Sequence, residues 1–269
     1  MLKLIAATIS SLFLLASPLS TSAQSVLRLA TTTSTENSGL LGAILPEFEA
    51  AHDVDVQIIS VGTGKALRLG ENGDVDVVMV HAKTAEEAFV DSGFGVSREP
   101  FMFNYFLIVG PEHDPAKLDG AASAVDAFRR LHSAQSLFIS RGDDSGTHMR
   151  ELSIWREADL SPQGVWYREA GQGMGKVLQI AGELRAYTVT DRGTWLKLRE
   201  GSGLAPLYSS SPPLYNPYSV IAVSPTRHPH VNTAAAGALV DWLKSEPAQS
   251  LIDRYRINGE RAFTPLYLD

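Results

Sequence analysis

The sequence contains no cysteine among its 269 residues. Disulfide bonds, thiolate metal sites and a catalytic cysteine are therefore excluded. Also excluded is the lipidated cysteine that would tether an exported protein at a new N-terminus. A chain without cysteine is compatible with an oxidising compartment.

Long hydrophobic runs are scarce, and the one that stands out lies at the start. Lys3 is followed by the apolar residues 4–16 and by the small residues Thr21, Ser22 and Ala23. This order is typical of an export signal. The apolar run is shorter than the roughly 20 residues of a membrane span, which favours a cleaved signal over an anchor helix. We expect a signal peptide at residues 1–23 and, after cleavage, a protein that is soluble outside the cytoplasmic membrane.

The sequence also lacks a basic excess. Its 23 Lys and Arg residues stand against 30 Asp and Glu residues, for a net charge of −7. A nucleic-acid binder would show a basic stripe, and none is found. An anionic ligand would have to be attracted locally, by helix ends and single arginines.

Strand-like and helix-like segments alternate along the rest of the chain, which predicts an α/β fold with mostly parallel strands. Strands are predicted at residues 26–30, 54–61, 75–80, 101–109, 137–139, 186–189 and 219–223. Helices are predicted at residues 40–51, 65–69, 85–92, 124–131, 149–158, 175–185, 232–245 and 247–253. Two stretches are candidate crossings between lobes, the apolar run 101–109 and the Ser/Pro-rich connector near 207–218. They predict lobe 1 from residues 24–104 and 211–269, and lobe 2 from residues 105–210.

The segment from Arg141 to His148 joins a predicted strand to a predicted helix. A helix N-terminus leaves backbone N–H groups unpaired and carries a partial positive charge. Ser145 and Thr147 add hydroxyl donors beside Gly146, and Arg141 adds a charged fork of N–H groups. This combination predicts a site for a small anion.

Two further segments join a strand to a helix in the same way. Residues 31–35 consist of four threonines and a serine, more hydroxyls than one helix cap requires. Residues 61–66 contain Gly62, Thr63 and Gly64, whose backbone could approach a ligand closely. A nucleotide-binding loop would need glycine at position 59 and Ser or Thr at position 66, so that class is excluded. A tight turn remains an alternative for this segment.

The sequence supports a catalytic site or a metal site less well than an anion site. Ser145 does not lie in a G-x-S-x-G elbow. A pair of Ser145 and His148, with Asp143 or Asp144 as the acid, gives an exported serine hydrolase as the hypothesis from another class. His228 and His230 lack further ligands at metal-binding spacing. We expect no cofactor and no metal. Arg192 is expected in a structural ion pair, and Trp155, Trp166, Trp195 and Trp242 are expected to pack in the core or on lobe surfaces.

Five segments together carry a family resemblance: residues 31–34, 61–67, 73–77, 141–148 and 187–194. With them the chain closely resembles the TupA-type periplasmic tungstate-binding proteins, which are substrate-binding components of ABC transporters. The resemblance implies a type II periplasmic binding-protein fold, in which two lobes joined by two crossing strands close over one oxyanion. It also implies a membrane permease as partner, and we expect a monomer.

The resemblance implies that hydroxyl groups and one arginine of this chain contact the ligand. The predicted site consists of Thr32, Thr33, Ser34, Thr63, Gly64, Arg141, Ser145, Gly146 and Thr147. Tungstate and molybdate are fully ionised at neutral pH and only accept hydrogen bonds, which suits such a pocket. Phosphate carries part of a proton and would use a carboxylate acceptor, provided by Asp76, Asp143 or Asp144 if one of them faces the ligand. Molybdate, phosphate and sulfate therefore stay alternatives, and the preference for tungstate comes from the resemblance.

Overall fold

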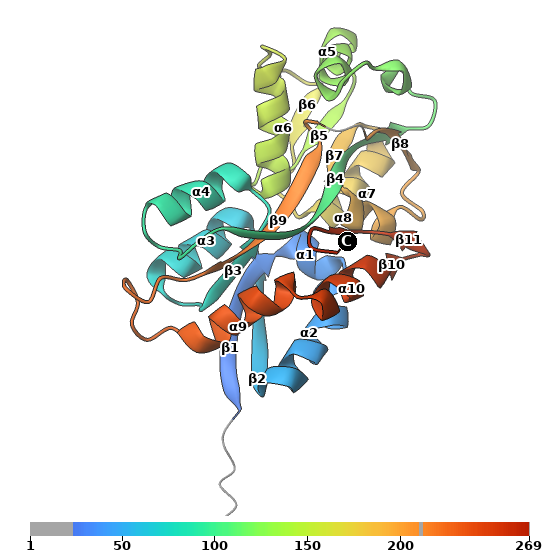
Figure 1. Cartoon of the computed structure of the whole chain (residues 1–269). Coiled ribbons are helices and arrows are strands. Elements are labelled where there is room, and N and C mark those ends of the chain that lie inside the picture. Colours follow the sequence, from blue (N-terminus) through green and yellow to red (C-terminus); the bar gives the residue numbers. More distant parts are fainter. Residues whose placement is uncertain (1–23, 210–211, 269) are drawn as a thin grey trace, which may run out of the picture.

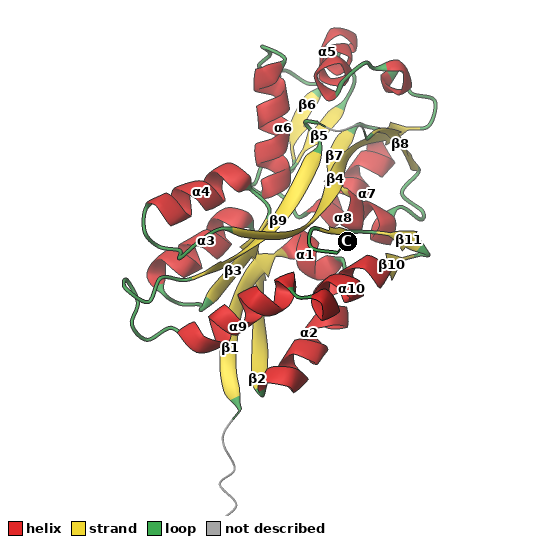
Figure 2. Cartoon of the chain, viewed as in Figure 1, coloured by secondary structure: helices red, strands yellow, loops and turns green. Residues whose placement is uncertain are grey.

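The computed structural model describes residues 24–209 and 212–268, and its elements are drawn in Figures 1 and 2. The predicted signal peptide lies outside the described residues. Helices and strands are mixed throughout, as the sequence predicts. In the described ranges, no helix is both long and apolar enough to cross a bilayer.

The N-terminal part alternates strands and helices around a central strand. Its elements are β1 (Ser25–Thr32), α1 (Thr33–Asn37), α2 (Leu40–His52), β2 (Val54–Val61), α3 (Thr63–Asn72), β3 (Val77–Val80) and α4 (Lys83–Asp91). β1 lies between β2 and β3 and runs parallel to both. Because Thr32 is level with Val61, the carboxyl ends of β1 and β2 meet at one edge of the sheet.

Two strands run between the lower and upper parts of the molecule in Figure 1. They are β4 (Glu99–Pro111) and β9 (Tyr215–Ala222). The first half of β4 pairs with β9, and its second half pairs with β7 (Thr188–Asp191) and β8 (Leu204–Tyr208). β9 pairs on its other side with β3. The chain therefore crosses twice, near the two stretches that the sequence indicated.

The remaining elements cover the sheet and complete the upper part. In the middle of the chain they are η1 (Leu118–Gly120), α5 (Ala124–Ala134), β5 (Phe138–Ser140), α6 (Gly146–Glu157), β6 (Tyr167–Glu169), α7 (Met174–Leu184) and α8 (Arg192–Leu198). Near the C-terminus they are α9 (Thr233–Lys244), α10 (Glu246–Arg254), β10 (Arg256–Ile257), β11 (Glu260–Arg261) and β12 (Thr264–Pro265). β12 returns to pair with β4, so the C-terminal segment is attached to the crossing strand.

The expectation of mostly parallel strands is wrong. β1 is parallel to β2 and β3, and β5 is parallel to β6, but β4 is antiparallel to all four of its neighbours and β9 to both of its own. One crossing strand leaves the N-terminal part and the other returns to it, so they run in opposite directions. Local sequence patterns do not indicate which distant strands pair or in which direction they run.

The core is made of apolar strands and aromatic side chains. All four residues of β3 are buried, because the sheet is covered on both faces there. The four tryptophans are buried as expected; Trp242 packs against Phe48, and Trp155 packs against Phe128. The second contact packs α6 against α5.

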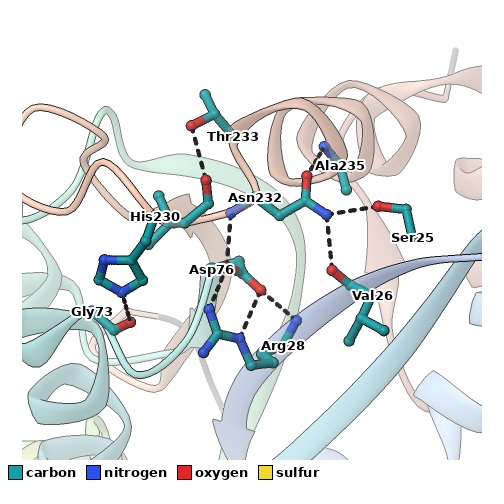
Figure 3. A network of polar contacts seen from close by, with 10 residues as sticks. Ser25, Val26, Arg28, Gly73, Asp76, His230, Asn232, Thr233 and Ala235 are labelled. Carbon is teal, nitrogen blue, oxygen red and sulfur yellow. Dashed lines mark hydrogen bonds and ion pairs between the residues drawn. The ribbon is translucent and has the colours of Figure 1, made fainter.

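Asp76, which was considered as a ligand contact, is instead a buried structural anchor (Figure 3). Its carboxylate accepts hydrogen bonds from the Arg28 backbone and guanidinium at 2.7, 3.2 and 2.9 Å, and from the Asn232 backbone at 2.9 Å. Burial opposes its ionisation, but these donors outweigh burial and lower the pKa of Asp76. Asp76 precedes β3, whereas the loops of the candidate site follow the strands.

Helix α6 is anchored by a buried carboxyl group. Glu151 accepts hydrogen bonds from Ser140 at 2.7 Å, from Tyr167 at 2.7 Å and from Trp155 at 3.1 Å. Burial raises the pKa of Glu151 to about 7, and its hydrogen bonds oppose the rise only in part. The residue ties α6 to the strand that leads into the Arg141 segment.

We expect Glu151→Gln to flatten the pH dependence of stability. The native state holds this proton up to about pH 7, whereas the unfolded chain releases it near pH 4.5. Wild-type stability therefore falls as pH rises between these values, by about 2–4 kcal/mol from this group. Urea denaturation of both proteins across this range measures the difference. Parallel stability curves would contradict the prediction.

Candidate functional site

The loops that follow β1, β2, β3 and β5 meet around one small cavity. The space between these loops measures about 180 Å³, with its opening to solvent included. Its lining residues are Thr32, Thr33, Ser34, Val61, Gly62, Thr63, His81, Arg141, Ser145, Gly146 and Thr147. Ligand sites for drug-sized molecules measure about 300–1,000 Å³, so this cavity is too small for such a molecule.

Eight of the nine predicted site residues line this cavity; their role as ligand contacts is a proposal. The exception is Gly64, which lines a separate depression with Leu67 and Arg68. Thr63 is the first residue of α3, and each further residue turns about 100° around a helix axis. Gly64 therefore faces away from the cavity that Thr63 faces.

The hydroxyl side chains of residues 31–35 have two roles: some stabilise the fold and some face the cavity. The Thr31 hydroxyl donates to the Met79 carbonyl at 2.9 Å, which ties β1 to β3. Thr32 caps α1, since its Oγ1 accepts from the Thr35 backbone N–H at 3.2 Å. Ser34 lies 3.1 Å from Thr32, oxygen to oxygen. Thr32 and Ser34 are thereby fixed at the cavity wall.

The cavity is closed by a contact between distant segments. The Gly146 backbone N–H, at the start of α6, donates to Thr63 Oγ1 at 3.1 Å. Gly146 also packs against the His81 ring, because a Cβ added to it would lie 3.1 Å from that ring. The absence of a side chain at position 146 is what allows this close approach.

Two buried polar atoms in the cavity wall have no hydrogen-bond partner among the described residues. They are Arg141 Nε and Thr147 Oγ1, on residues exposed by only 4% and 1%. The other end of the guanidinium pairs with Asp143. A buried polar group without a partner costs about 1–3 kcal/mol, and native structures keep few of them. Two such atoms at one small cavity indicate a polar ligand.

No carboxylate of the described residues lines the cavity. Asp143 accepts from the Ser145 backbone at 3.2 Å and pairs with Arg141. Burial opposes the ionisation of Asp143, but these donors prevail and lower its pKa. The Asp144 side chain is 90% exposed. Neither group, nor Asp76, supplies the acceptor that a protonated phosphate would use.

The contacts of Ser145 are those of a helix cap. Its Oγ accepts from the His148 backbone N–H at 3.3 Å. The His148 ring turns elsewhere: Nδ1 accepts from the Asp144 backbone at 3.1 Å, and Nε2 lies 3.9 Å from the Glu169 carboxylate. A hydrolase would need the imidazole on the serine oxygen. This geometry does not support the serine hydrolase hypothesis.

His81 lines the cavity and was missed by the sequence analysis. Its Nε2 lies 3.2 Å from Ser34 Oγ, and its Nδ1 lies 3.0 Å from Asn216 Oδ1. Burial is the main cause that lowers the pKa of His81. The available signal was its position directly after the buried strand β3, at the same sheet edge as Thr32.

The other candidate side chains serve the fold. His228 Nε2 lies 2.8 Å from the Glu71 carbonyl, and His230 Nε2 lies 2.9 Å from the Gly73 carbonyl. Arg192 pairs with Glu260 at 3.0 Å, as expected. Among residues 24–209 and 212–268, no group of three or more His, Cys, Asp or Glu side chains is placed to hold a metal ion.

A wider cleft adjoins the cavity between α4 and α6. It measures about 480 Å³, with its opening to solvent included, and shares His81 and Gly146 with the cavity. Lys83 and Arg150 are its charged lining residues, and both are cationic. The cleft therefore offers an approach with positive charge on both sides.

Comparisons with known proteins agree with this geometry. Residues 19–247 match the PBP superfamily domain. The chain is 44% identical to the tungstate-binding protein TupA of Peptoclostridium acidaminophilum, over 91% of this chain and 87% of that protein. The crystal structure of the tungstate ABC transporter from Geobacter sulfurreducens matches with a TM-score of 0.80 and 48% identity, covering 87% of this chain and all of that one.

A second solved structure supports the same assignment. The tungstate-binding protein TupA from Desulfovibrio alaskensis matches with a TM-score of 0.79 and 40% identity, covering 90% of this chain and 99% of that one. The fold is thus that of the periplasmic binding proteins, with two lobes joined by two crossing strands. The chain belongs to the PBP superfamily and, within it, to the TupA family of tungstate-binding proteins.

Proposed function

We propose that this protein captures a tetrahedral oxyanion, most specifically tungstate, in the periplasm and delivers it to an ABC importer. The observation that carries the proposal is the pair of unpartnered buried atoms, Arg141 Nε and Thr147 Oγ1, in a hydroxyl-lined cavity. An oxyanion would accept hydrogen bonds from both. The names of the family relatives support tungstate as that anion.

The cavity favours an anion without a proton. Its polar side chains are hydroxyls, one imidazole and one guanidinium, and no carboxylate of the described residues reaches it. Tungstate, molybdate and sulfate offer only acceptors, which such donors can satisfy. A protonated phosphate would find no carboxylate of the described residues to accept its O–H, and only hydroxyl oxygens would be left as acceptors.

Binding would act through a hinge. We assign lobe 1 to residues 24–104 and 211–269 and lobe 2 to residues 105–210, with β4 and β9 as the crossings. Thr63 of lobe 1 meets Gly146 of lobe 2 at the cavity. An anion held by both lobes stabilises the closed form by its higher affinity for that form. The closed monomer would be what the membrane permease recognises, and no chemical turnover is involved.

The experiment that tests the proposal is a competition among oxyanions. Tungstate at about 100 times its Kd should raise the free energy of unfolding by about 2.7 kcal/mol. We expect a clear rise in Tm with tungstate and a much smaller one with sulfate or phosphate at equal concentration. Calorimetric titration of tungstate against molybdate then ranks these two anions, which are nearly equal in size. Stabilisation by phosphate equal to that by tungstate would overturn the assignment.

A further inference from the structure

Ser34, on the cavity wall, is backed by a titratable ring. His81 Nε2 lies 3.2 Å from Ser34 Oγ on one side, and Nδ1 lies 3.0 Å from Asn216 Oδ1 on the other. The ring stacks on Tyr218 with centroids 4.7 Å apart. The imidazole therefore connects the cavity to the crossing strand β9, which carries Asn216.

The hydrogen bonds beyond His81 fix which ring nitrogen carries a proton. Asn216 Nδ2 donates to Asn104 Oδ1 at 2.8 Å and to Tyr218 Oη at 3.2 Å. Its Oδ1 therefore faces the imidazole as an acceptor, and Nδ1 must be the donor. A neutral imidazole protonated on Nδ1 has a bare Nε2, which accepts.

A bare Nε2 orients the Ser34 hydroxyl away from a ligand. Ser34 has one hydroxyl proton and gives it to Nε2. Thr32 Oγ1 accepts from the Thr35 backbone and lies 2.7 Å from Thr35 Oγ1 and 3.1 Å from Ser34 Oγ, so its own proton can go to either hydroxyl. The Ser34 hydroxyl then presents only lone pairs to the cavity. A dianion needs the opposite orientation.

Resting on the proposed function, we propose that His81 takes up one proton from solvent when the dianion binds. The imidazolium then donates from Nε2 to Ser34 Oγ, while Nδ1 keeps its bond to Asn216. Ser34 turns its own proton to the anion. No covalent bond changes; one proton moves from water to Nε2.

The charges around His81 determine whether its ring is neutral or protonated. Burial lowers the pKa of His81, and Arg141 lowers it further, whereas the Asp191 carboxylate at the end of β7 raises it. The N-terminal end of α6, at Gly146, also faces the ring and disfavours a positive charge. A dianion in the cavity adds negative charge beside the ring and favours the imidazolium. The ring is neutral without the ligand and charged with it.

Calorimetric titration with tungstate in buffers of different ionisation enthalpy counts the protons. At micromolar tungstate near neutral pH, the number of protons that the wild type takes up per bound anion should approach one. Its affinity should fall with rising pH by up to about tenfold per unit between the two pKa values of His81. Buffer-independent heats with tight binding would overturn the inference and leave the proposed function intact. An absence of tungstate binding would overturn the proposed function instead.

His81→Gln provides the decisive variant. A glutamine amide can donate permanently to Ser34 and does not titrate, so the variant should bind tungstate without proton uptake and without this pH dependence. His148→Gln is the matched control, since His148 is also buried beside the site but faces Glu169. It should keep the proton uptake. Equal uptake in His81→Gln and wild type would overturn the inference.

A measurement on the wild type tests the inference even if the His81→Gln variant fails to fold. With 15N-labelled histidine, tungstate should shift the His81 Nε2 resonance from the position of a bare nitrogen to that of a protonated one. Nδ1 should stay protonated throughout. A ring whose two signals do not change on saturation would overturn the proposal.

Discussion

Replacing Arg141 by alanine is expected to weaken tungstate binding by about 2–5 kcal/mol, roughly 30-fold to several thousand-fold. The buried guanidinium is the one permanent positive charge among the described residues that line the cavity, and its Nε has no hydrogen-bond partner among them. Its loss leaves a buried dianion without its main counter-charge. It also frees the Asp143 carboxylate, which would then repel the anion. Calorimetric titration of both proteins measures the effect.

Two matched variants separate charge from geometry at this position. Arg141→Lys keeps the charge but loses the planar fork, and we expect part of the affinity to be lost. Asp143→Asn removes the competing carboxylate while leaving Arg141 in place, so its affinity should equal or exceed that of the wild type. An Arg141→Ala protein with unchanged affinity would remove Arg141 from the site.

Placing a negative charge at Ser145 should have an effect of similar or greater size. Ser145 caps α6 and lines the cavity. Aspartate is an equally good N-cap, so Ser145→Asp should fold normally. Its carboxylate would face the dianion at short range, where each pair of like unit charges costs up to about 4 kcal/mol at an effective dielectric constant of 20. We expect binding to weaken by at least about 3 kcal/mol.

The control is Ser145→Asn, which has the same shape and capping ability but no charge. It should keep most of the affinity that Ser145→Asp loses, and both variants should melt within a few degrees of the wild type. Binding is measured by titration and folding by thermal denaturation. Equal affinities of the aspartate and asparagine variants would show that residue 145 does not face the anion.

The sequence predicted the strand-to-helix junctions well because their signals are local. Residues 54–61 and 26–30 were recognised by their apolar patterns, and the structure has strands there. Thr32 and Ser145 were recognised as hydroxyl groups at helix starts, and the structure shows that each also caps its helix. The short strand β8 was missed, since five residues in a partly exposed edge leave little pattern.

Strand direction and side-chain orientation were beyond the sequence. The antiparallel pairing of β4 with β9 joins residues more than a hundred positions apart, and no periodicity records such a partner. Gly64 and Thr63 are adjacent in sequence, yet the turn of α3 directs only Thr63 into the cavity. The roles of Asp76 and Asp143 likewise depended on which arginine side chains lie beside them in the folded chain.

The sequence by itself determined the chemistry of this protein: hydroxyls and an arginine at strand-to-helix junctions, with no cysteine and no basic stripe. That chemistry is local, because backbone N–H groups at a helix start and the residues beside them are neighbours in the chain. Only the tertiary structure brought the junctions to one cavity, kept the carboxylates out of it and placed His81 behind Ser34. These are decided by packing between distant segments, where burial and charge act through space rather than along the chain.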